Sequence, residues 1–243
     1  QWRGKKYETL EAFNKNWGTP FWSQGYQNFE ESHAPKKTAS GQNPSQVLDW
    51  KIFHSDLIND FHALQANIIR TYSKDRFITH NCMGFSDIVS YYDLAKQLDF
   101  VSHDQYCEGY WKNYEETKIT EEHHRQGIFP AAELDFIRSL KKDNFWIMEQ
   151  QSSIAGWEIM GRTPRPGQIA LWSMQSVAHG ADTIVYFRWR SCPMGTEQYW
   201  HGILPHSGKP GRAYYEIKAL INRVKPLMKE IEAFQYIYKN YPI

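Results

Sequence analysis

Four short apolar runs alternate with helix-like segments along the last two thirds of this chain, and this alternation limits the folds open to it. The apolar residues within each run are consecutive and do not alternate with polar ones, which is typical of parallel strands that are covered by helices. The runs are RFITHNCM (76–83), DFVSHDQY (99–106), NFWIMEQ (144–150) and DTIVYFRWR (182–190). The helical segments that follow them are 87–98, 130–143, 165–180 and 211–231. The sequence therefore predicts an α/β fold with about four parallel strands alternating with helices.

Each apolar run becomes polar at its C-terminal end: HN follows FIT, HDQY follows FVS, EQQ follows WIM and RWR follows VYF. In parallel α/β folds, and above all in (β/α)8 barrels, the active site is built at that end of the strands. Glu149 ends the run FWIM. A glutamate just past a strand is usually a solvated loop residue, because glutamate is rarely buried unless paired. The regular pattern makes a catalytic carboxylate an equally good interpretation.

The first third of the chain is predicted to be helical. Asn43 and Pro44 form a helix start, with Asn as the cap and Pro in the first turn, and the helix is expected to reach Tyr72. Four apolar residues recur at helical spacing within it: Leu57, Phe61, Leu64 and Ile68. Before it, a helical face is expected from Trp2, Tyr7, Leu10 and Phe13, with a second helix start at Thr9.

Charge and cysteine content exclude several classes of protein. The chain has 28 Lys and Arg against 27 Asp and Glu, and because no basic stripe appears, a nucleic-acid partner is not expected. The three cysteines have no metal-binding spacing, which favours a reducing compartment such as the cytoplasm and no zinc or other cofactor. No run of about 18 apolar residues exists, so no membrane span or membrane partner is expected. Ten Trp and fifteen Tyr suit the apolar faces of sugar rings.

Several long motifs, in order, resemble the catalytic barrel of the glycoside hydrolase family 42 β-galactosidases. They are LEAFNKNWGTPFWSQGY, LDFVSHDQY, FWIMEQQSSIAGW, RPGQIALWSMQSVAHGADTIVYFRWR and EQYWHGIL. The resemblance runs from about Gln1 to Leu220. It implies that residues 1–231 are the C-terminal half of a TIM (β/α)8 barrel, starting after its fourth strand, and that residues 232–243 are a linker or the start of another domain.

The resemblance also implies roles for individual residues. Glu149 matches the nucleophile at the end of the seventh barrel strand, and Tyr106 is expected to reach toward it. The substrate-binding residues would be Trp22 and Trp157, which match aromatic walls of the sugar pocket, and Glu197 and His201, which match groups that bind galactose hydroxyls. The segment EQYWH has one residue more than the commoner family spacing, which affects the placement of His201.

Each of these residues also has an ordinary structural interpretation. Trp157 is also consistent with a core residue, Glu197 with a surface acid, and His201 with a half-buried structural histidine. The remaining histidines singled out, His123, His124 and His206, are expected on the surface.

The function implied is a retaining β-galactosidase that forms a galactosyl-enzyme intermediate on Glu149, with a galactoside such as lactose as substrate. The family's acid/base residue belongs to an Asn-Glu pair that has no counterpart in this chain, so the chain is expected to be a fragment that is inactive alone. The alternative is a non-catalytic carbohydrate-binding or assembly module derived from the barrel. A homo-oligomer is expected: a family-like trimer for a full-length protein, or a dimer paired through strand edges for a fragment.

Overall fold

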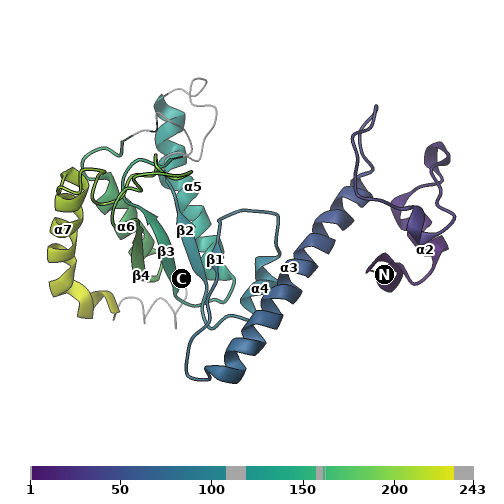
Figure 1. The fold of residues 1–243 in the computed structure, drawn as a ribbon, viewed down its shortest axis with the longest axis horizontal. Helices are drawn as coiled ribbons and strands as arrows, with labels where there is room; N and C mark the ends of the chain where they lie inside the picture. The colour runs from purple at the N-terminus through teal and green to yellow at the C-terminus, as the bar shows by residue number, and fades with distance from the viewer. Residues whose placement is uncertain (1, 108–118, 157–160, 162, 233–243) are drawn as a thin grey trace. The chain divides into compact units, whose positions relative to one another are not determined.

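The fold of the chain, seen in a computed structural model, divides into two compact units (Figure 1). The structure describes residues 2–107, 119–156, 161 and 163–232, with the side chains of 119–126 excepted. The first unit comprises Gln1–Asp75 and Ser86–Leu94, and the second comprises Arg76–Phe85 and Ala95–Ile243.

The first unit begins with two short helices. Helix α1 (Trp2–Tyr7) ends where Glu8 adopts a positive φ of 60°, and Thr9 caps α2 (Leu10–Trp17) by accepting a hydrogen bond from the Ala12 amide. Two 3-10 turns follow, η1 (Phe21–Ser23) and η2 (Phe29–Glu31). The second helix start expected at Thr9 is therefore confirmed. The core of this unit is aromatic, with Phe13 fully buried among other rings: those of Tyr7, Trp17, Tyr26 and Phe29.

Helix α3 (Pro44–Tyr72) has the bounds that its sequence predicts. The Asn43 side chain accepts hydrogen bonds from the amides of Ser45 and Gln46, and Pro44 occupies the first turn. The apolar stripe is nevertheless exposed in the described chain: Leu57, Phe61, Leu64 and Ile68 keep 50 to 61% of their surface. The buried positions of α3 are instead mostly polar: Gln46, Asp49, Ser55, Asn59, His62 and Ala66.

The second unit contains a four-stranded parallel sheet with strands in sequence order, as predicted. The strands are β1 (Asn81–Cys82), β2 (Ser102–Gln105), β3 (Phe145–Gln151) and β4 (Ala181–Phe187). Strands β1 and β2 are shorter than the predicted runs 76–83 and 99–106, because only a few of their residues pair with a neighbour.

The helices between these strands lie where the sequence predicts them but with other ends. Helix α4 (Tyr91–Ala95) is shorter than expected, whereas α5 (Ile119–Ser139) begins before Pro130 and contains it. Helix α6 (Gln168–Ala178) follows Gly167, whose positive φ of 88° suits glycine. Helix α7 (Arg212–Val224) passes into the 3-10 turn η4 (Lys225–Leu227), where Pro226 cannot continue the hydrogen-bond ladder.

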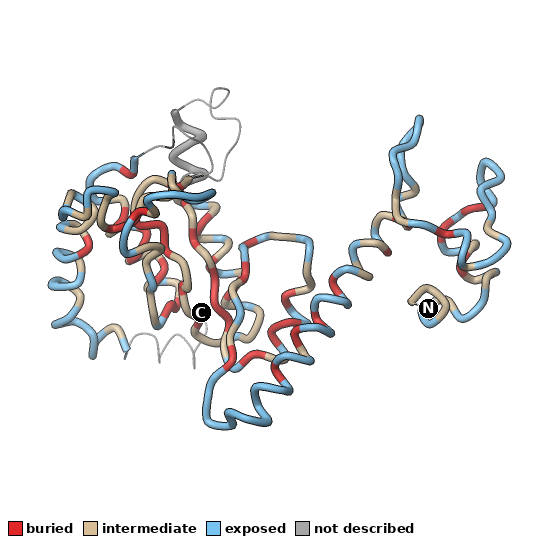
Figure 2. The backbone as a smooth tube through the Cα atoms, in the orientation of Figure 1, coloured by how far each residue is buried: buried red, intermediate tan, exposed pale blue. Residues whose placement is uncertain are grey.

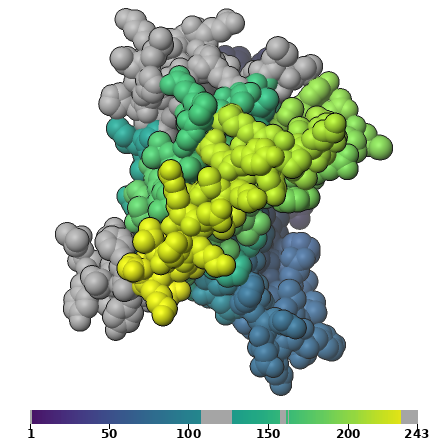
Figure 3. Space-filling view, turned by 90° about the vertical axis from the view of Figure 1, so that its left-hand side faces the viewer, coloured from purple at the N-terminus to yellow at the C-terminus, as the bar shows by residue number. Residues whose placement is uncertain are grey.

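Helices α5 and α6 cover one face of the sheet and enclose the main core of this unit (Figure 2). Ile137 of α5, Ile147 of β3 and Ile169 of α6 are fully buried, and each such side chain contributes roughly 1.5–3 kcal/mol. Helix α7 packs on α6 and lies along the surface drawn in yellow in Figure 3. Of the helices that the structure describes, none is long and apolar enough to cross a membrane.

Candidate active site

The sheet carries its polar residues on two faces. Tyr186 of β4 bonds Ser173 of α6 through their hydroxyls at 2.8 Å, so its side chain lies on the face covered by helices, which we call the helix face. Gln150 is the Cα partner of both Gln105 and Tyr186 and therefore shares that face. The opposite face, which carries Glu149, is the site face.

A β-bulge in β3 determines which face Glu149 occupies. His103 pairs with Ile147, but the next residue of β2, Asp104, pairs with Glu149, so Met148 is an extra residue in β3. A bulge of this kind resets the alternation of side chains, and bulges are common beside active sites. Asp104 and Glu149 consequently lie side by side on the site face.

Tyr106 confirms this placement by its contact with Glu149. Its hydroxyl donates a 2.5 Å hydrogen bond to Oε2 of Glu149, as the sequence predicted that it would reach toward this residue. Burial, followed by the bond to Glu149 and that residue's charge, raises the pKa of Tyr106, so the phenol stays protonated as a donor. One oxygen of Glu149 is thus held in a fixed orientation.

Asp104 lies beside Glu149 on the site face and is bonded to Asn81. The sequence analysis singled out neither residue. The Asn81 amide donates to both carboxylate oxygens of Asp104, at 2.9 and 3.1 Å. Burial, and then the charge of Glu149, raise the pKa of Asp104 to about 7. The available signal was the polar end of each strand run, HN and HDQY, to which these residues belong.

Glu197 and His201 lie on the segment that follows β4. Glu197 accepts a 2.9 Å hydrogen bond from Arg188 and is half exposed. Burial, and then the neighbouring His206, lower the pKa of His201. The ring of Trp200, between them, packs edge-on against Tyr106 at 5.0 Å between centroids, which brings this segment to the site face.

The loop after β3 packs tightly against the same segment. The His201 amide donates to the Ile154 carbonyl at 3.1 Å. A Cβ atom on Gly156 would lie 2.5 Å from the ring of Trp200, so only glycine fits there. The loop that follows Glu149 is therefore fixed on the loop that carries Glu197 and His201.

His206 was expected on the surface as an uninvolved residue, and it is exposed, but it ties this segment together. Its Nε2 lies 3.0 Å from the Cys192 carbonyl and 2.8 Å from the Gln198 carbonyl. Because carbonyl oxygens only accept, Nε2 carries the proton. Arg190 in turn donates to the His206 carbonyl.

The structure does not test the roles expected for the two tryptophans of the sugar pocket, Trp22 and Trp157. Trp157 lies outside the described residues, as do the side chains of His123 and His124. Trp22 lies in the first unit, where it is 69% exposed and stacks on Phe21. Both assignments stay predictions.

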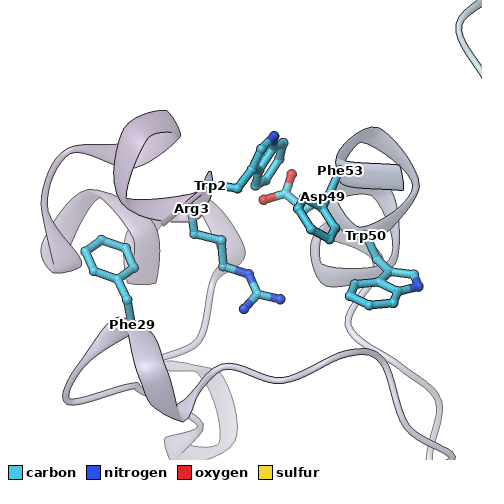
Figure 4. A pocket seen from close by; sticks show the side chains of 6 residues that line it. All are labelled: Trp2, Arg3, Phe29, Asp49, Trp50 and Phe53. Atoms are coloured by element: carbon cyan, nitrogen blue, oxygen red, sulfur yellow. The ribbon is translucent and has the colours of Figure 1, made fainter. Parts of the chain in front are cut away.

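The first unit has a cavity of its own, of about 360 Å³, lined by Trp2, Arg3, Phe29, Asp49, Trp50 and Phe53 (Figure 4). Its charged groups are bonded to the protein: Arg3 to the carbonyls of Ser32 and His33, and Asp49 to Lys6. Within the described residues, no group of three or more His, Cys, Asp or Glu is placed to hold a metal ion.

One family of known proteins matches nearly the whole chain. The sequence profile of a family described as beta-galactosidase, glycoside hydrolase 42, matches residues 1–227. The chain belongs to the glycoside hydrolase family 42 β-galactosidases.

Relatives named as β-galactosidases align with nearly the whole chain. The chain is 39% identical to beta-galactosidase BgaA of Clostridium cellulovorans over 236 residues, which cover 96% of this chain and 34% of that protein. It is 35% identical to a beta-galactosidase of Thermus thermophilus, over 93% of this chain and 36% of the relative. The chain thus spans about a third of the length of the curated relatives that it matches.

Solved structures of β-galactosidases show the same fold. The beta-galactosidase of the psychrophilic Marinomonas ef1 superposes with a TM-score of 0.85 at 34% identity, covering 95% of this chain and 36% of that one. The beta-galactosidase of the haloarchaeon Halorubrum lacusprofundi gives a TM-score of 0.81 at 33% identity, covering 90% and 33%. The four parallel strands and their helices are accordingly part of a TIM barrel, as predicted.

Proposed function

We propose that this chain supplies the nucleophile half of a retaining β-galactosidase. The observation that carries the proposal is the hydrogen bond from Tyr106 to Glu149 at the C-terminal end of β3. It leaves Oε1 of Glu149 to attack the anomeric carbon, while Oε2 is held by a donor that stays protonated. Family membership, and relatives named as β-galactosidases, support galactosides as the substrate class.

The reaction follows from the chemistry of carboxylates. Glu149 forms a bond to the anomeric carbon as the bond to the aglycone breaks, which gives a galactosyl ester that water then hydrolyses. The second carboxyl of a retaining enzyme stands about 5–5.5 Å from the first and protonates the departing oxygen. We assign that acid to a segment preceding Gln1 in a longer polypeptide. In this proposal residues 1–231 are the second half of the barrel and 232–243 lead out of it.

Sugar binding is assigned to the segment around Trp200. Glu197 and His201 would bind galactose hydroxyls, since both lie on the segment that Trp200 fixes against Tyr106. Trp157, eight residues after Glu149, and Trp22 would supply apolar walls. The three cysteines are free thiols, in keeping with a proposed cytoplasmic location.

The proposed oligomeric state follows from the edges of the sheet. In the described sheet β1 and β4 are the two edge strands, and a further strand could pair with the outer side of each. In a full-length protein, strands of the other half would pair with them and the protein would form a trimer like its family. An isolated chain would pair the β1 edge of one copy with the β4 edge of another.

The test uses the polypeptide of the complete gene and the variant Glu149→Gly. Removal of the nucleophile should abolish most turnover of an aryl galactoside, and added azide should restore part of it with an α-configured galactosyl azide as product. Glu197→Gly is the matched control: it should weaken galactose binding, and azide should give no α-azide. Near-normal rates for Glu149→Gly would contradict the assignment.

A second measurement separates the enzyme from a non-catalytic module. The 243-residue chain alone should not hydrolyse lactose, because general-acid assistance is worth about 10²–10⁴ in rate. The complete polypeptide should hydrolyse it. A complete polypeptide that binds galactose without any turnover would favour the sugar-binding module instead.

A further inference from the structure

Asp104 is a second carboxyl group beside the proposed nucleophile. It is the Cα partner of Glu149 across the β2–β3 pair, and both side chains lie on the site face. The Asn81 amide holds both of its oxygens. Asp104 therefore has a fixed position next to a group that changes its charge during the reaction.

The surroundings of Asp104 favour only one negative charge on the pair. Within the described residues, the titratable groups that interact with it electrostatically are Cys82 on β1, Tyr106 directly after β2 and Glu149 on β3, and none of these three supplies a positive charge. Burial raises the pKa of the Cys82 thiol to about 12, so it stays neutral. Two carboxyl groups this close do not both ionise readily. The proton on Asp104 and the charge on Glu149 are thus linked.

We propose that Asp104 is the proton-carrying partner of Glu149: it binds a proton more strongly while Glu149 is the anion, and it releases this proton when Glu149 becomes the galactosyl ester. The proposal rests on the function proposed above for Glu149. It makes Asp104 a positioning residue, because it acts through the charge of Glu149 and not on the sugar. The Asn81 amide fixes its carboxyl group, and the fraction of a proton that Asp104 carries leaves to solvent in each glycosylation step and returns when the ester is hydrolysed.

The size of the effect follows from linkage between charge and proton binding. The pKa of Asp104, about 7, is raised first by burial and second by the charge of Glu149, and the ester removes the second cause. At pH 7 such a group is half protonated, so up to about half a proton per site should be released when the ester forms. The ester also leaves Asp104 as the only carboxylate of the pair.

The experiment traps Glu149 in the polypeptide of the complete gene with 2-deoxy-2-fluoro-β-D-galactosyl fluoride. The carboxylate bonds to the anomeric carbon and fluoride departs, so the chemistry itself neither takes nor yields a proton. Proton release is followed by an indicator dye in weak buffer across pH 6 to 8, and peptide mass analysis locates the label. We expect Asp104→Asn to release up to about half a proton per site less than the wild type at pH 7.

Two further variants make the outcome specific. Glu133→Gln is the matched control, because burial raises the pKa of Glu133 to about 7 as well, yet Glu149 does not contribute to that shift. It should release as much as the wild type. Asn81→Ala should move the release to higher pH, because the hydrogen bond from Asn81 lowers the pKa of Asp104.

The outcomes separate the two proposals. A label absent from Glu149 would overturn the proposed function. A label on Glu149 with equal proton release from wild type and Asp104→Asn would overturn the role of Asp104 and leave the function intact. If Asp104→Asn does not fold, an Asn81→Ala protein with an unshifted release profile would overturn it equally.

Discussion

The Tyr106 hydroxyl donates a 2.5 Å hydrogen bond to Oε2 of Glu149 across neighbouring strands. Tyr106→Phe removes this bond and keeps the ring that Trp200 packs against. A hydrogen bond to a charged group contributes about 1.5–3 kcal/mol, so in the polypeptide of the complete gene we expect kcat/KM for an aryl galactoside to fall about 10- to 100-fold. Tyr215→Phe, on the exposed part of α7, is the matched control and should leave the rate unchanged. Equal rates for both variants would show that the hydroxyl does not act on Glu149.

From the hydrogen bonds of His206 we predict that its removal weakens substrate binding more than it slows the chemical step. His206→Ala frees the carbonyls of Cys192 and Gln198 and loosens the segment that bears Glu197 and His201. Since a typical hydrogen bond is worth about 1 kcal/mol, we expect the KM of the complete polypeptide for an aryl galactoside to rise several-fold while its kcat changes less.

His206→Gln supplies an amide donor and should recover part of the affinity. His179→Ala, which removes a surface contact with Asp135, is the control and should keep the wild-type KM. If His206→Ala lowers kcat and leaves KM unchanged, the segment does not depend on His206 for its position.

From the lowered pKa of Asp49 we predict that the protein loses folding stability in acid. Burial alone would raise its pKa, but hydrogen bonds from Lys6, Tyr7 and Trp17 outweigh burial and lower it below the ordinary 3.8. A lowered pKa contributes stability above the unfolded value, and this contribution is lost as the pH falls through the folded value. Asp49→Ala should therefore destabilise by about 1.5–3 kcal/mol at pH 7.

The measurement is denaturant unfolding of both proteins between pH 7 and pH 3. The difference in unfolding free energy should shrink below pH 4, as protonation of Asp49 weakens the bonds in the wild type. A difference that stays constant down to pH 3 would contradict this account of Asp49.

We predict that a substitution at Gln150 stabilises the protein. It is fully buried, and neither Nε2 nor Oε1 has a hydrogen-bond partner within the described part of the chain. Gln150→Met keeps the length of the side chain and removes both polar atoms, so thermal unfolding should move to higher temperature by the equivalent of about 1–3 kcal/mol. Gln105→Met is the contrasting variant: it breaks the bond to His103 and should lower the unfolding temperature. A lower unfolding temperature for Gln150→Met would mean that its amide is satisfied in solution.

The sequence predicts most of the sheet because apolar runs and their polar ends depend on local pattern. Glu149 was singled out in this way, whereas Tyr106 was expected near it from the resemblance to family 42, and the contact between them is now seen. Asp104 was missed because its importance depends on pairing with a strand some forty residues away. The carbonyl contacts of His206 likewise come from the path of a loop, which has no periodicity to read.

The extra residue in β3, Met148, decides which side chain of the strand faces the site. Without the bulge, Met148 would stand opposite Asp104, and Glu149 would face Gln105 beneath the helices. An unpaired carboxylate buried there costs several kcal/mol, so the charge of Glu149 itself favours the irregular register. In the regular register the side chain on the site face would be the thioether of Met148, and in the observed register it is the carboxylate of Glu149. A substitution that removes the bulge from β3 would therefore abolish the proposed activity even if it changed no residue that contacts the substrate.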